Sequence, residues 1–502
     1  MINIYLNNTS FAYLYFNNDK EKIELYKIIL KECRVFEPNS KFVKSFRNGS
    51  WDGYYNFFNI IAENPQKFHF QIHIGYLKNV ILNLENIGLE YKINNKLYKL
   101  KELDINSLIY NLKLPFKPYE HQIEALNFIN TNRDIPLYLF KSATGSGKSL
   151  IIYMLIEYFK KQSLNNTLIL VPTKDLVQQL AGDFKTYGYK GDLNLIDGNS
   201  KEKVIKKGIN ISTWQSANNI NKSYFKDIDN LIIDEAHTAT ADILKSIILN
   251  SNNVKVKVGL TATIPIEIKE KHTLLGLFYY QKTLITNNDL INKKMATPTK
   301  VINVFLQYPK KTFNKYKDEI EYITNNIYRN IYVANFILKL KTKHNAVVLY
   351  RTNEYAKMLS KLLVYLSNKN LDYKNINIVF KNSEIKEDMI NILVDKFSYE
   401  KVIKKDEYKD LDIRFIGDFK ILVFGGFVST KMRKYILDIL NTKDDYIVLG
   451  NWGIMKAGIN IKSLRYLVLA QSLKSYISII QAIGRVMRLY NCLLYTSPSP
   501  RD

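Results

Sequence analysis

Short, almost uniformly apolar runs separated by longer amphipathic stretches dominate the chain from residue 136 onward. Runs of a first series occupy residues 137–140, 167–171, 209–212, 231–233 and 256–260. Runs of a second series occupy residues 301–306, 346–350, 420–423, 446–449 and 466–469. Apolar strands that alternate with helices are typical of a parallel sheet covered on both faces. The pattern therefore predicts two similar α/β domains, which join near residues 295–298.

The first 112 residues follow a different pattern, which predicts a small α+β domain. Apolar residues recur at helical spacing between residues 18 and 33, and residues 68–76 and 80–84 have the character of strands. Pro115 and Pro118 then interrupt the chain and mark a boundary. The expected domains occupy residues 1–112, 113–296 and 297–491.

Two segments do not fit the repeating pattern. Residues 367–419 are rich in Lys, Asp, Asn and Glu, and they are interpreted as an insertion, either a solvated decoration or a segment that alters which strands fit the cleft. Residues 492–502 resemble the translation of a transposase-based sequencing adapter, and the alternative is a disordered Ser/Pro-rich terminus. On the first interpretation the native chain continues after about Asn491 and Cys492 has no function.

Charge and cysteine content narrow the class of protein. The 502 residues include 72 Lys and Arg against 47 Asp and Glu, a formal net charge of +25. Such an excess favours a polyanionic partner, although an AT-rich genome produces the same Lys-rich composition. The presence of only Cys33 and Cys492 argues against a disulfide framework, and no Cys/His group has zinc-like spacing. No apolar run is long enough to cross a membrane and no signal peptide is evident, so we expect a cytoplasmic protein.

A glycine-rich stretch, Gly145-Ser-Gly-Lys-Ser149, directly follows the apolar run at 137–140 and opens a helical stretch. Glycines allow backbone N–H groups to close around phosphate oxygens, and the start of a helix adds a favourable partial charge. Lys148 would then reach the β- and γ-phosphates of a nucleotide, and Ser149 would bind Mg²⁺. The predicted phosphate-binding loop consists of Thr144, Gly145, Ser146, Gly147, Lys148 and Ser149. A strict form of the pattern has glycine where this chain has Ser142.

An acidic pair, Asp234 and Glu235, follows the apolar run at 231–233. Carboxylates at the carboxyl end of a strand face the crevice in which α/β sheets bind ligands. Asp234 is suited to bind Mg²⁺, and Glu235 is placed to polarise an attacking water. An isolated Asp-Glu pair would more commonly be a solvated turn, but here it lies downstream of a phosphate-binding loop.

Two arginines far downstream complete the candidate catalytic set. Arg485 and Arg488 are three residues apart and hence lie on one face if this segment is helical. Permanently charged guanidinium groups suit the charge that develops on a transferring phosphoryl group. Gln481, in the same segment, is a candidate for positioning water. The alternative is a basic helix face without a catalytic role.

Taken in order, the motifs between residues 116 and 488 resemble those of superfamily 2 helicases. The matching positions are Gln122, Gly145–Ser149, 171–173, 213–215, the Asp-Glu-Ala-His box at 234–237, 261–263, Gly458 and 481–488. The resemblance implies two RecA-like domains that hydrolyse ATP with Mg²⁺ as cofactor. It also implies that Gln122 reads the adenine edge, although a glutamine at a helix start is the alternative.

The same resemblance assigns coupling and nucleic-acid roles. Thr261 and Thr263 would couple hydrolysis to domain movement, Gly458 belongs to the motif that links nucleotide state to strand grip, and both arginines would act across the cleft. The residues expected to contact a nucleic-acid backbone are Pro172, Thr173, Thr213, Trp214 and Gln215. Trp214 is equally well interpreted as a core aromatic residue.

A narrower resemblance lies in the N-terminal domain. Phe36-Glu-Pro38 and Gly49-Ser-Trp-Asp-Gly53 are similar to a pattern in phage UvsW-like helicases. It implies an enzyme of a phage-infected cell that translocates on branched DNA and remodels junctions, forks and R-loops in recombination, repair and replication. Implied partners are single-stranded and branched DNA, RNA–DNA hybrids, and single-strand-binding or recombination proteins.

Basic and aromatic residues alternate in this same stretch. They are Lys41, Lys44 and Arg47, interleaved with Phe42, Phe46 and Trp51. Such residues together can grip a backbone and stack on an exposed base. The alternative is that the aromatic residues are core and the basic residues face solvent.

Other functions remain open on the sequence alone. One is a double-strand DNA translocase of the restriction-system type, which strand- and triplex-displacement assays separate from a helicase. Another is an RNA helicase, because the motor motifs do not report the sugar. The last is a non-motor, ATP-regulated nucleic-acid clamp, which would keep its function when Glu235 is replaced by Gln.

Overall fold

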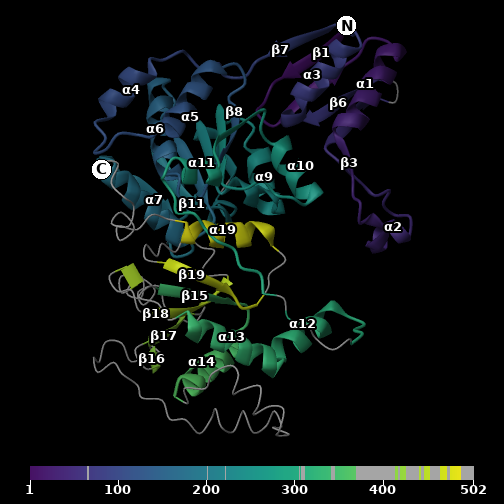
Figure 1. Ribbon diagram of the computed structural model, residues 1–502. Coiled ribbons are helices and arrows are strands. Elements are labelled where there is room, and N and C mark those ends of the chain that lie inside the picture. Colours follow the sequence, from purple (N-terminus) through teal and green to yellow (C-terminus); the bar gives the residue numbers. More distant parts are fainter. Residues whose placement is uncertain are drawn as a thin grey trace. The chain divides into compact units, whose positions relative to one another are not determined.

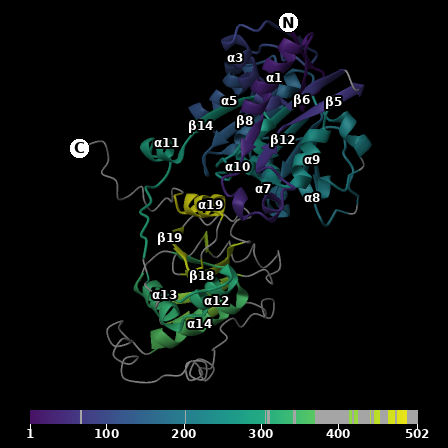
Figure 2. The same cartoon turned by 90° about the vertical axis from the view of Figure 1, so that its right-hand side faces the viewer.

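The computed structural model of this chain divides into two compact units, Met1–Leu290 and Ile291–Asp502, drawn in Figures 1 and 2. It describes residues 1–64, 67–200, 202–220, 222–304, 306, 311–340, 345–368, 413–416, 419–424, 440–441, 446–452, 464–471 and 475–487. Most of the predicted insertion at 367–419, Gly458, Arg488 and the tail at 492–502 lie outside these residues. The division into three domains at residues 112 and 296 stays a prediction.

The N-terminal part of the first unit contains a five-stranded sheet of order β5-β6-β2-β1-β7. Its strands are β1 (Ile2–Leu6), β2 (Phe11–Tyr15), β5 (Phe58–Asn64), β6 (Lys67–His73) and β7 (Tyr91–Asn95). All neighbours are antiparallel except β1 and β7, which are parallel. Two helices, α1 (Asp19–Glu32) and α3 (Leu77–Asn86), share a core with the sheet. The expected α+β character is confirmed.

The structure confirms one predicted helix in this region and contradicts one predicted strand. The helix expected at 18–33 is α1, and the Asn18 side chain caps it by accepting a hydrogen bond from the Glu21 N–H. The strand expected at 80–84 is wrong, because these residues lie in α3. The buried residues Leu77, Val80 and Leu84 are three and four positions apart, which is the spacing of one helix face.

A small projecting lobe interrupts the N-terminal sheet. Its base is a two-stranded antiparallel sheet of β3 (Arg34–Phe36) and β4 (Tyr54–Asn56). Beyond these strands lie a short 3-10 helix, η1 (Ser40–Phe42), and α2 (Lys44–Arg47). Figure 1 shows α2 standing away from the remainder of the first unit. We call residues 36–54 the tip lobe.

The larger part of the first unit is built on a seven-stranded sheet of order β10-β11-β9-β12-β13-β8-β14. All its neighbouring strands are parallel. The strands are β8 (Leu137–Ser142), β9 (Thr167–Val171), β10 (Leu193–Ile196), β11 (Ile209–Thr213), β12 (Asn230–Asp234), β13 (Val256–Thr261) and β14 (Tyr280–Ile285). The five predicted runs are the five inner strands. The edge strands β10 and β14 are half-exposed and carry polar residues, so they lack the apolar signal.

Helices cover both faces of this sheet, as the apolar runs predict. One face packs on α5 (Glu120–Thr131), α6 (Lys148–Lys161) and α7 (Lys174–Thr186). The other packs on α8 (Trp214–Ala217), α9 (Asp242–Asn250) and α10 (Ile268–Gly276). Within β9, Ile169 and Val171 face the first layer while Leu168 and Leu170 face the second. Each such fully buried side chain contributes about 1.5–3 kcal/mol.

The remaining short elements of the first unit connect these layers. They are η2 (Ile74–Tyr76), α4 (Ile105–Leu112), η3 (Lys222–Asp227), η4 (Ala236–Thr240) and α11 (Asn287–Asn292). The N-terminal sheet joins the seven-stranded sheet through the turn between β1 and β2. There the Ser10 hydroxyl donates to the Leu249 carbonyl (2.8 Å), and the buried Lys257 ammonium donates to Ser10 Oγ (2.9 Å). The two sheets of the first unit are therefore joined by buried polar contacts as well as apolar packing.

The second unit contains a five-stranded sheet of order β16-β17-β18-β15-β19. Its strands are β15 (Asn345–Tyr350), β16 (Ile413–Ile416), β17 (Phe419–Phe424), β18 (Tyr446–Asn451) and β19 (Leu464–Leu469). Only β16 runs antiparallel to its neighbour. Among the described residues of this unit, the helices are α12 (Tyr316–Asn325), α13 (Ile327–Lys339), α14 (Asn353–Asn368) and α19 (Tyr476–Val486). Four of the five runs predicted for this domain are confirmed as parallel strands.

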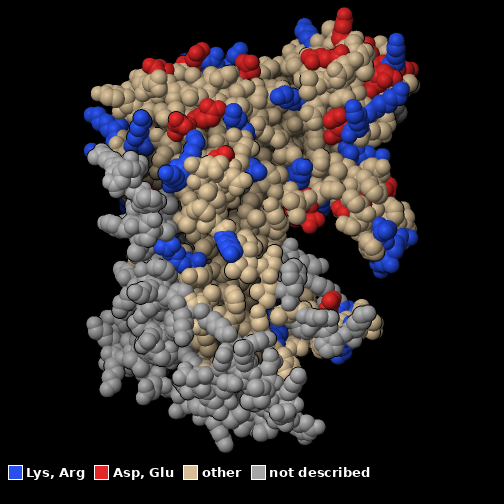
Figure 3. All heavy atoms as spheres, viewed as in Figure 1, with Lys and Arg blue, Asp and Glu red and all other residues tan. Residues whose placement is uncertain are grey.

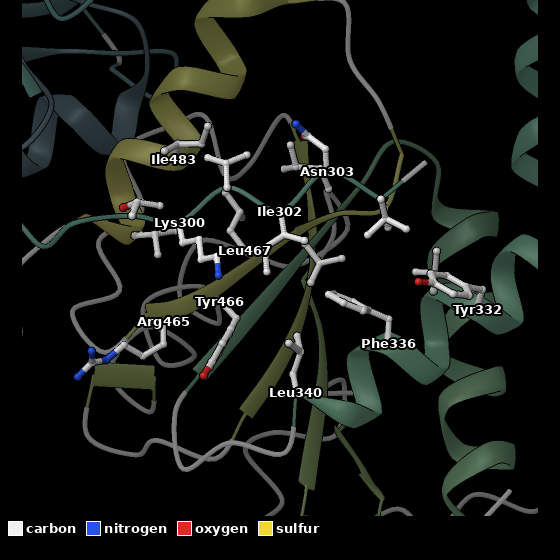
Figure 4. A pocket seen from close by; sticks show the side chains of 18 of the residues that line it. Lys300, Ile302, Asn303, Tyr332, Phe336, Leu340, Arg465, Tyr466, Leu467 and Ile483 are labelled. Atoms are coloured by element: carbon white, nitrogen blue, oxygen red, sulfur yellow. The ribbon is translucent and has the colours of Figure 1, made fainter. Parts of the chain in front are cut away.

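The fifth run, at 301–306, does not form the predicted strand in its described residues 301–304 and 306. These residues line a cavity of about 640 Å³ beside β19, α13 and α19. Figure 4 shows Ile302 of this segment, Phe336 of α13 and Leu467 of β19 around that cavity. The β-branched residues favour extended backbone, but a strand also needs a ladder of hydrogen bonds with a neighbour. Among the described residues, β19 forms its ladder with β15, and no such ladder joins β19 to residues 301–304 or 306.

Among the described residues, no helix combines the length and the apolar character needed to cross a membrane.

Candidate functional site

The phosphate-binding loop predicted at 144–149 connects β8 to α6 at the carboxyl edge of the seven-stranded sheet. Gly145 and Gly147 have φ angles of 81° and 79°, in the left-handed region that disfavours other residues. Gly147 is the N-cap of α6, so the helix begins with the N–H groups of Lys148 and Ser149. The loop therefore has the local geometry of a helix N-terminus that binds anions.

Residues of α5 support the outer side of this loop. Gln122 Nε2 donates to the Ser146 carbonyl (3.0 Å), and His121 Nε2 lies 2.8 Å from the same oxygen. Gln122 Oε1 also accepts from the Tyr119 N–H (2.9 Å). A Cβ added to Gly147 would lie 2.4 Å from Gln122 Nε2, so this glycine permits the close approach. The predicted adenine-reading Gln122 thus also holds the phosphate-binding loop in place.

Ser142, the departure from the strict glycine pattern, has a structural role. Its hydroxyl lies 2.7 Å from the hydroxyl of Ser146, and both residues are buried. The pair links the end of β8 to the centre of the loop. The serine at this position therefore adds a hydrogen bond that glycine would not provide.

A chain of polar contacts runs across the edge of the sheet from the loop to β13. Lys148 Nζ lies 3.6 Å from Glu235 Oε1, and Glu235 Oε2 lies 3.4 Å from His237 Nδ1. His237 Nδ1 is also 3.1 Å from Thr261 Oγ1, which donates to the Thr263 carbonyl (2.8 Å). The phosphate-binding loop, the Asp-Glu-Ala-His box and the segment at 261–263 are therefore in contact through these five residues.

The acidic pair at the end of β12 has unusual electrostatics and backbone geometry. Burial and the negative charge of Glu235 raise the pKa of Asp234, and the Lys148 ammonium opposes this shift. Glu235 has φ 51° and ψ 50°, a left-handed conformation that costs about 1–2 kcal/mol for a residue with a side chain. Its N–H donates to Asp234 Oδ1 (2.9 Å). Strained backbone of this kind is concentrated at functional sites.

Ser149, the predicted magnesium ligand, contacts a tyrosine of the next helix. Its hydroxyl lies 2.7 Å from the hydroxyl of Tyr187, the residue that ends α7. The Tyr187 ring packs edge-on against Phe116 at a centroid distance of 5.8 Å. Burial raises the pKa of the nearby Asp183, while a hydrogen bond with Ser149 opposes the increase. A metal ion on Ser149 would compete with these contacts.

The residues at this edge suit a nucleotide phosphate and a magnesium ion. Thr144 Oγ1 is buried and, among the residues that the structure describes, has no hydrogen-bond partner. The Ser149 hydroxyl and the Asp234 carboxylate are oxygen donors of the type that Mg²⁺ takes alongside phosphates. In the described part of the chain, no group of three or more His, Cys, Asp or Glu is arranged to hold a metal ion. A magnesium ion at this edge would therefore need phosphate oxygens among its ligands.

The predicted nucleic-acid contacts lie on the first unit with mixed accessibility. The hydroxyls of Thr173 and Thr213 cap α7 and α8 by accepting backbone N–H groups. Trp214 packs against the apolar core, which agrees with its interpretation as a core aromatic, whereas Gln215 is exposed. Pro172 is half-buried beside Thr173. Their contact with a nucleic acid stays a prediction.

The residues predicted to act from the second unit are only partly described. Gln481 is buried on α19. Arg485 belongs to the same helix, but its side chain lies outside the described residues, as do Arg488 and Gly458 entirely. The helical spacing expected for the segment is confirmed as far as Val486. Contact of these residues with a nucleotide on the first unit stays a prediction.

Sequence reasoning did not identify three residues of this site. His121 is adjacent to Gln122, so the motif itself indicated its position but not its contact with Ser146. Ser142 was noted only as a departure from a pattern. Tyr187 is separated from Ser149 by 38 residues, and no local pattern signals a contact that depends on how α6 and α7 pack.

Comparisons with known proteins match two segments of this chain and most of its length. A family model described as type III restriction enzyme, res subunit, matches residues 115–266, and one described as helicase conserved C-terminal domain matches residues 398–490. ATP-dependent DNA helicase uvsW of Enterobacteria phage T4 is 25% identical over 481 residues, covering 91% of this chain and 83% of that protein. Putative helicase 22 of Sulfolobus islandicus filamentous virus is 26% identical over 419 residues, covering 80% and 67%.

Among solved structures, that of T4 UvsW has a TM-score of 0.47 and 20% identity, and the match covers 97% of this chain and 87% of that one. The two family matches coincide with the segments that carry the phosphate-binding loop and the paired arginines. The sequence similarity to the T4 protein extends over both segments and most of the N-terminal region. This chain therefore carries the paired domains of superfamily 2 helicases and is similar to phage T4 UvsW over most of its length.

Proposed function

We propose that this chain is an ATP-dependent DNA helicase that translocates on, unwinds and remodels branched DNA such as junctions, forks and R-loops. The observation that carries the proposal is the contact chain from Lys148 through Glu235 and His237 to Thr261 beside a phosphate-binding loop. The similarity to an ATP-dependent DNA helicase over 91% of the chain supports the same activity.

The residues of the first unit would divide the work of hydrolysis. The loop from Thr144 to Ser149 would hold the phosphates with backbone N–H groups, and Lys148 would neutralise the terminal phosphates. Glu235 would orient and polarise the attacking water, and its 3.6 Å separation from Lys148 leaves both groups at the same reaction centre. Ser149 and Asp234 would hold Mg²⁺, which neutralises charge on the phosphate oxygens.

The 3.6 Å separation of Lys148 Nζ and Glu235 Oε1 is longer than a hydrogen bond, so this ion pair is loose. The side chains are 11% and 18% exposed, so both remain accessible from the edge of the sheet. A γ-phosphate would offer Lys148 a stronger partner than a carboxylate at 3.6 Å, because it carries more negative charge. Binding of nucleotide would then release Glu235 for its role with water.

A link from hydrolysis to movement is available through His237. This imidazole contacts both Glu235 and Thr261, and Thr261 in turn orders Thr263 by accepting its N–H (3.3 Å). A change in the charge near Glu235 would therefore alter the loop after β13. We infer that Thr261 and Thr263 couple nucleotide state to domain movement, with Arg485 and Arg488 of the second unit completing the site on closure.

DNA rather than RNA is proposed as the substrate because the similarity to a DNA helicase covers 91% of this chain. The net charge of +25 suits a polyanion of either kind. Branched substrates, and association with single-strand-binding or recombination proteins, follow from the same similarity. Contacts to phosphates would predominate, so we expect weak sequence preference.

Hydrolysis rates on four substrates test this proposal. The substrates are single-stranded DNA, linear duplex, a four-way junction and an RNA–DNA hybrid, each measured across a salt series. We expect the junction and the hybrid to stimulate hydrolysis and to be unwound. Equal activity on all four substrates, or stimulation only by RNA, would contradict the branched-DNA assignment.

A Glu235→Gln variant separates a motor from a clamp. The substitution keeps the size of the side chain but removes the carboxylate, so we expect a roughly 10²- to 10⁴-fold loss of hydrolysis with nucleotide binding retained. Strand displacement should stop with hydrolysis. If instead the variant keeps full function on nucleic acid, the chain is a clamp. Triplex displacement without strand displacement by the unmodified chain would indicate a double-strand translocase.

A further inference from the structure

The tip lobe is stiffened by contacts among its own aromatic residues. Gly53 has φ +82°, and a Cβ added there would lie 3.0 Å from the rings of both Phe36 and Phe46. Trp51 Nε1 donates to the Tyr54 carbonyl (2.7 Å). The glycine therefore lets two rings close over the backbone, and these aromatic residues are used in holding the lobe together.

The base of the lobe is fixed by one arginine. The Arg34 guanidinium lies 4.0 Å from the centroid of the Tyr54 ring and forms an ion pair with Asp52. Ladder pairing of β3 with β4 continues into the lobe through the hydrogen bond from the Glu37 N–H to the Gly53 carbonyl (2.8 Å). The lobe is thus carried on a rigid two-stranded stem rather than on a flexible loop.

Phe42 is the most exposed aromatic residue of the lobe, ahead of Phe36, which is 44% exposed. Phe42 is 71% exposed, and Lys41 Nζ lies 5.2 Å from the centroid of its ring. A single exposed aromatic residue is common on protein surfaces and by itself indicates nothing. The alternative that this phenylalanine is a core residue is nevertheless wrong, whereas Phe46 and Trp51 are half-buried.

Basic residues predominate near Phe42, although the base of the lobe carries Glu37 and Asp52. Residues 38–51 include Lys41, Lys44 and Arg47 and no acidic residue. All three basic side chains are exposed. Figure 3 shows Lys and Arg side chains gathered at the end of the lobe that projects from the first unit. An exposed ring on the same projecting lobe as three exposed basic side chains suits a partner that offers a flat apolar face flanked by phosphates.

We propose that the tip lobe binds the branch point of a nucleic acid, with Phe42 stacking on the last base pair before the strands separate. Lys41, Lys44 and Arg47 neutralise the phosphates on either side. Grooves that bind long single strands use several aromatic residues in succession. In this lobe Phe42 is the most exposed ring, whereas Phe36, which is 44% exposed, packs against Tyr54. The exposed face of Phe42 matches one exposed base-pair face, which a branch provides and an intact duplex does not. This inference rests on the proposed function, since it assumes a substrate with separating strands.

Binding of a synthetic fork and of a single strand, without ATP, tests the proposal. We expect Phe42→Ala to weaken fork binding by roughly 5- to 150-fold, the range for loss of one base–aromatic contact, with little change for the single strand. Phe42→Trp should restore it. The matched control is Tyr110→Ala, which removes an aromatic residue that is 83% exposed on α4. A 2-aminopurine at the last base pair of the fork should change fluorescence with the unmodified chain and not with Phe42→Ala.

The basic residues are tested by salt dependence. Replacing Lys41, Lys44 and Arg47 by Gln should reduce the slope of log affinity against log salt by about 2–3, since each phosphate contact contributes about 0.7–0.9. Phe42→Ala should leave that slope unchanged, because stacking releases no counterions. If both variants lower the slope equally, or if neither alters fork binding, the assignment of separate roles is wrong.

Failure of this inference can be distinguished from failure of the proposed function. A chain that hydrolyses ATP and unwinds junctions, but whose Phe42→Ala variant binds forks normally, refutes only the tip-lobe assignment. A chain that binds no nucleic acid refutes both. Vesicles containing phosphatidylserine address the other surface that attracts aromatic and basic residues together. Phe42-dependent binding to such vesicles with unchanged fork binding would overturn the proposal in favour of a membrane surface.

Discussion

Lys148 and Lys257 lie at opposite ends of the strands of the same seven-stranded parallel sheet, and their ammonium groups have different kinds of partner. Lys148 begins α6 at the carboxyl edge, and its ammonium lies 3.6 Å from a carboxylate. Lys257 lies near the start of β13, where its ammonium donates to Ile248 O (2.7 Å), Ser10 Oγ (2.9 Å) and Thr9 O (3.3 Å). Its side chain is fully buried, whereas that of Lys148 is 11% exposed.

The difference contrasts a lysine with a proposed catalytic role and a lysine held in a structural contact. A lysine ammonium has three donors, and those of Lys257 are all directed to neutral oxygens, which leaves no donor for a ligand. Lys148 has one distant acidic partner and free access to the edge where phosphate would bind. We infer that the ammonium at the carboxyl edge is left with a loose partner so that a nucleotide phosphate can bind it. The amino edge instead joins the N-terminal sheet to the seven-stranded sheet.

Removal of Lys148, the proposed catalytic lysine, should have the largest effect. Lys148→Ala removes the charge that faces the terminal phosphates, so we expect ATP hydrolysis to fall by roughly 10²- to 10³-fold. Steady-state hydrolysis with saturating single-stranded DNA measures this effect, and circular dichroism confirms that the variant is folded. Lys257→Met is the matched control, because the residue lies at the other edge of the sheet and should keep hydrolysis within about twofold. Equal losses in the two variants would contradict the contrast.

The carboxyl edge can be predicted from the sequence more fully than the amino edge. Lys148 and Glu235 each lie in a compact motif directly after an apolar run, and parallel strands bring their carboxyl ends to a common edge. Lys257 interrupts an apolar run without any accompanying motif. Its partners Thr9 and Ser10 are 248 and 247 residues away, so their contact depends on docking between two sheets.

Other elements illustrate the same limit. The strand expected at 80–84 is part of α3 because a short apolar run fits either period, and packing against the N-terminal sheet decides between them. The left-handed conformation of Glu235 also has no sequence signal, since φ > 0 is disfavoured for a glutamate. Local motifs therefore predict the chemistry of the site, and tertiary packing sets the details that surround it.

Replacement of the structural lysine should lower stability. Lys257→Met keeps most of the side-chain volume but removes the nitrogen that donates to buried oxygens, so we expect the free energy of unfolding to fall by about 1–3 kcal/mol near pH 10, where deprotonating the lysine costs least. Urea denaturation followed by tryptophan fluorescence measures this change. A variant as stable as the unmodified chain would show that the ammonium contacts only offset the cost of burying a charge.

The pH dependence of stability should distinguish the two lysines further. Burial lowers the pKa of Lys257 to about 7 from an ordinary value of 10.5. Between these values the unfolded chain binds more protons than the folded chain, so stability rises with pH across this window and is lowest below pH 7. The slope from this group approaches about 1.4 kcal/mol per pH unit.

The difference between the unmodified chain and Lys257→Met isolates this contribution from the many tyrosines that titrate at high pH. We expect the stability curve of the variant to be flatter between neutral pH and about pH 10. A difference that stays constant across that range would mean that Lys257 remains protonated in the folded chain, held by its three oxygen acceptors.

The smallest expected effect concerns the contact that Ser149 makes before any metal binds. Its hydroxyl lies 2.7 Å from the Tyr187 hydroxyl, so a magnesium ion on Ser149 must displace that partner. Tyr187→Phe removes the competing hydroxyl and keeps the ring that packs against Phe116. A neutral hydrogen bond contributes about 0.5–1.5 kcal/mol, so the KM for Mg·ATP should fall by roughly 2- to 10-fold with kcat little changed.

Tyr189→Phe, at a neighbouring tyrosine, should leave KM unchanged. An increase in KM for Tyr187→Phe would show instead that the tyrosine orients Ser149 toward the metal, and the carboxyl edge would then be preorganised rather than unsatisfied.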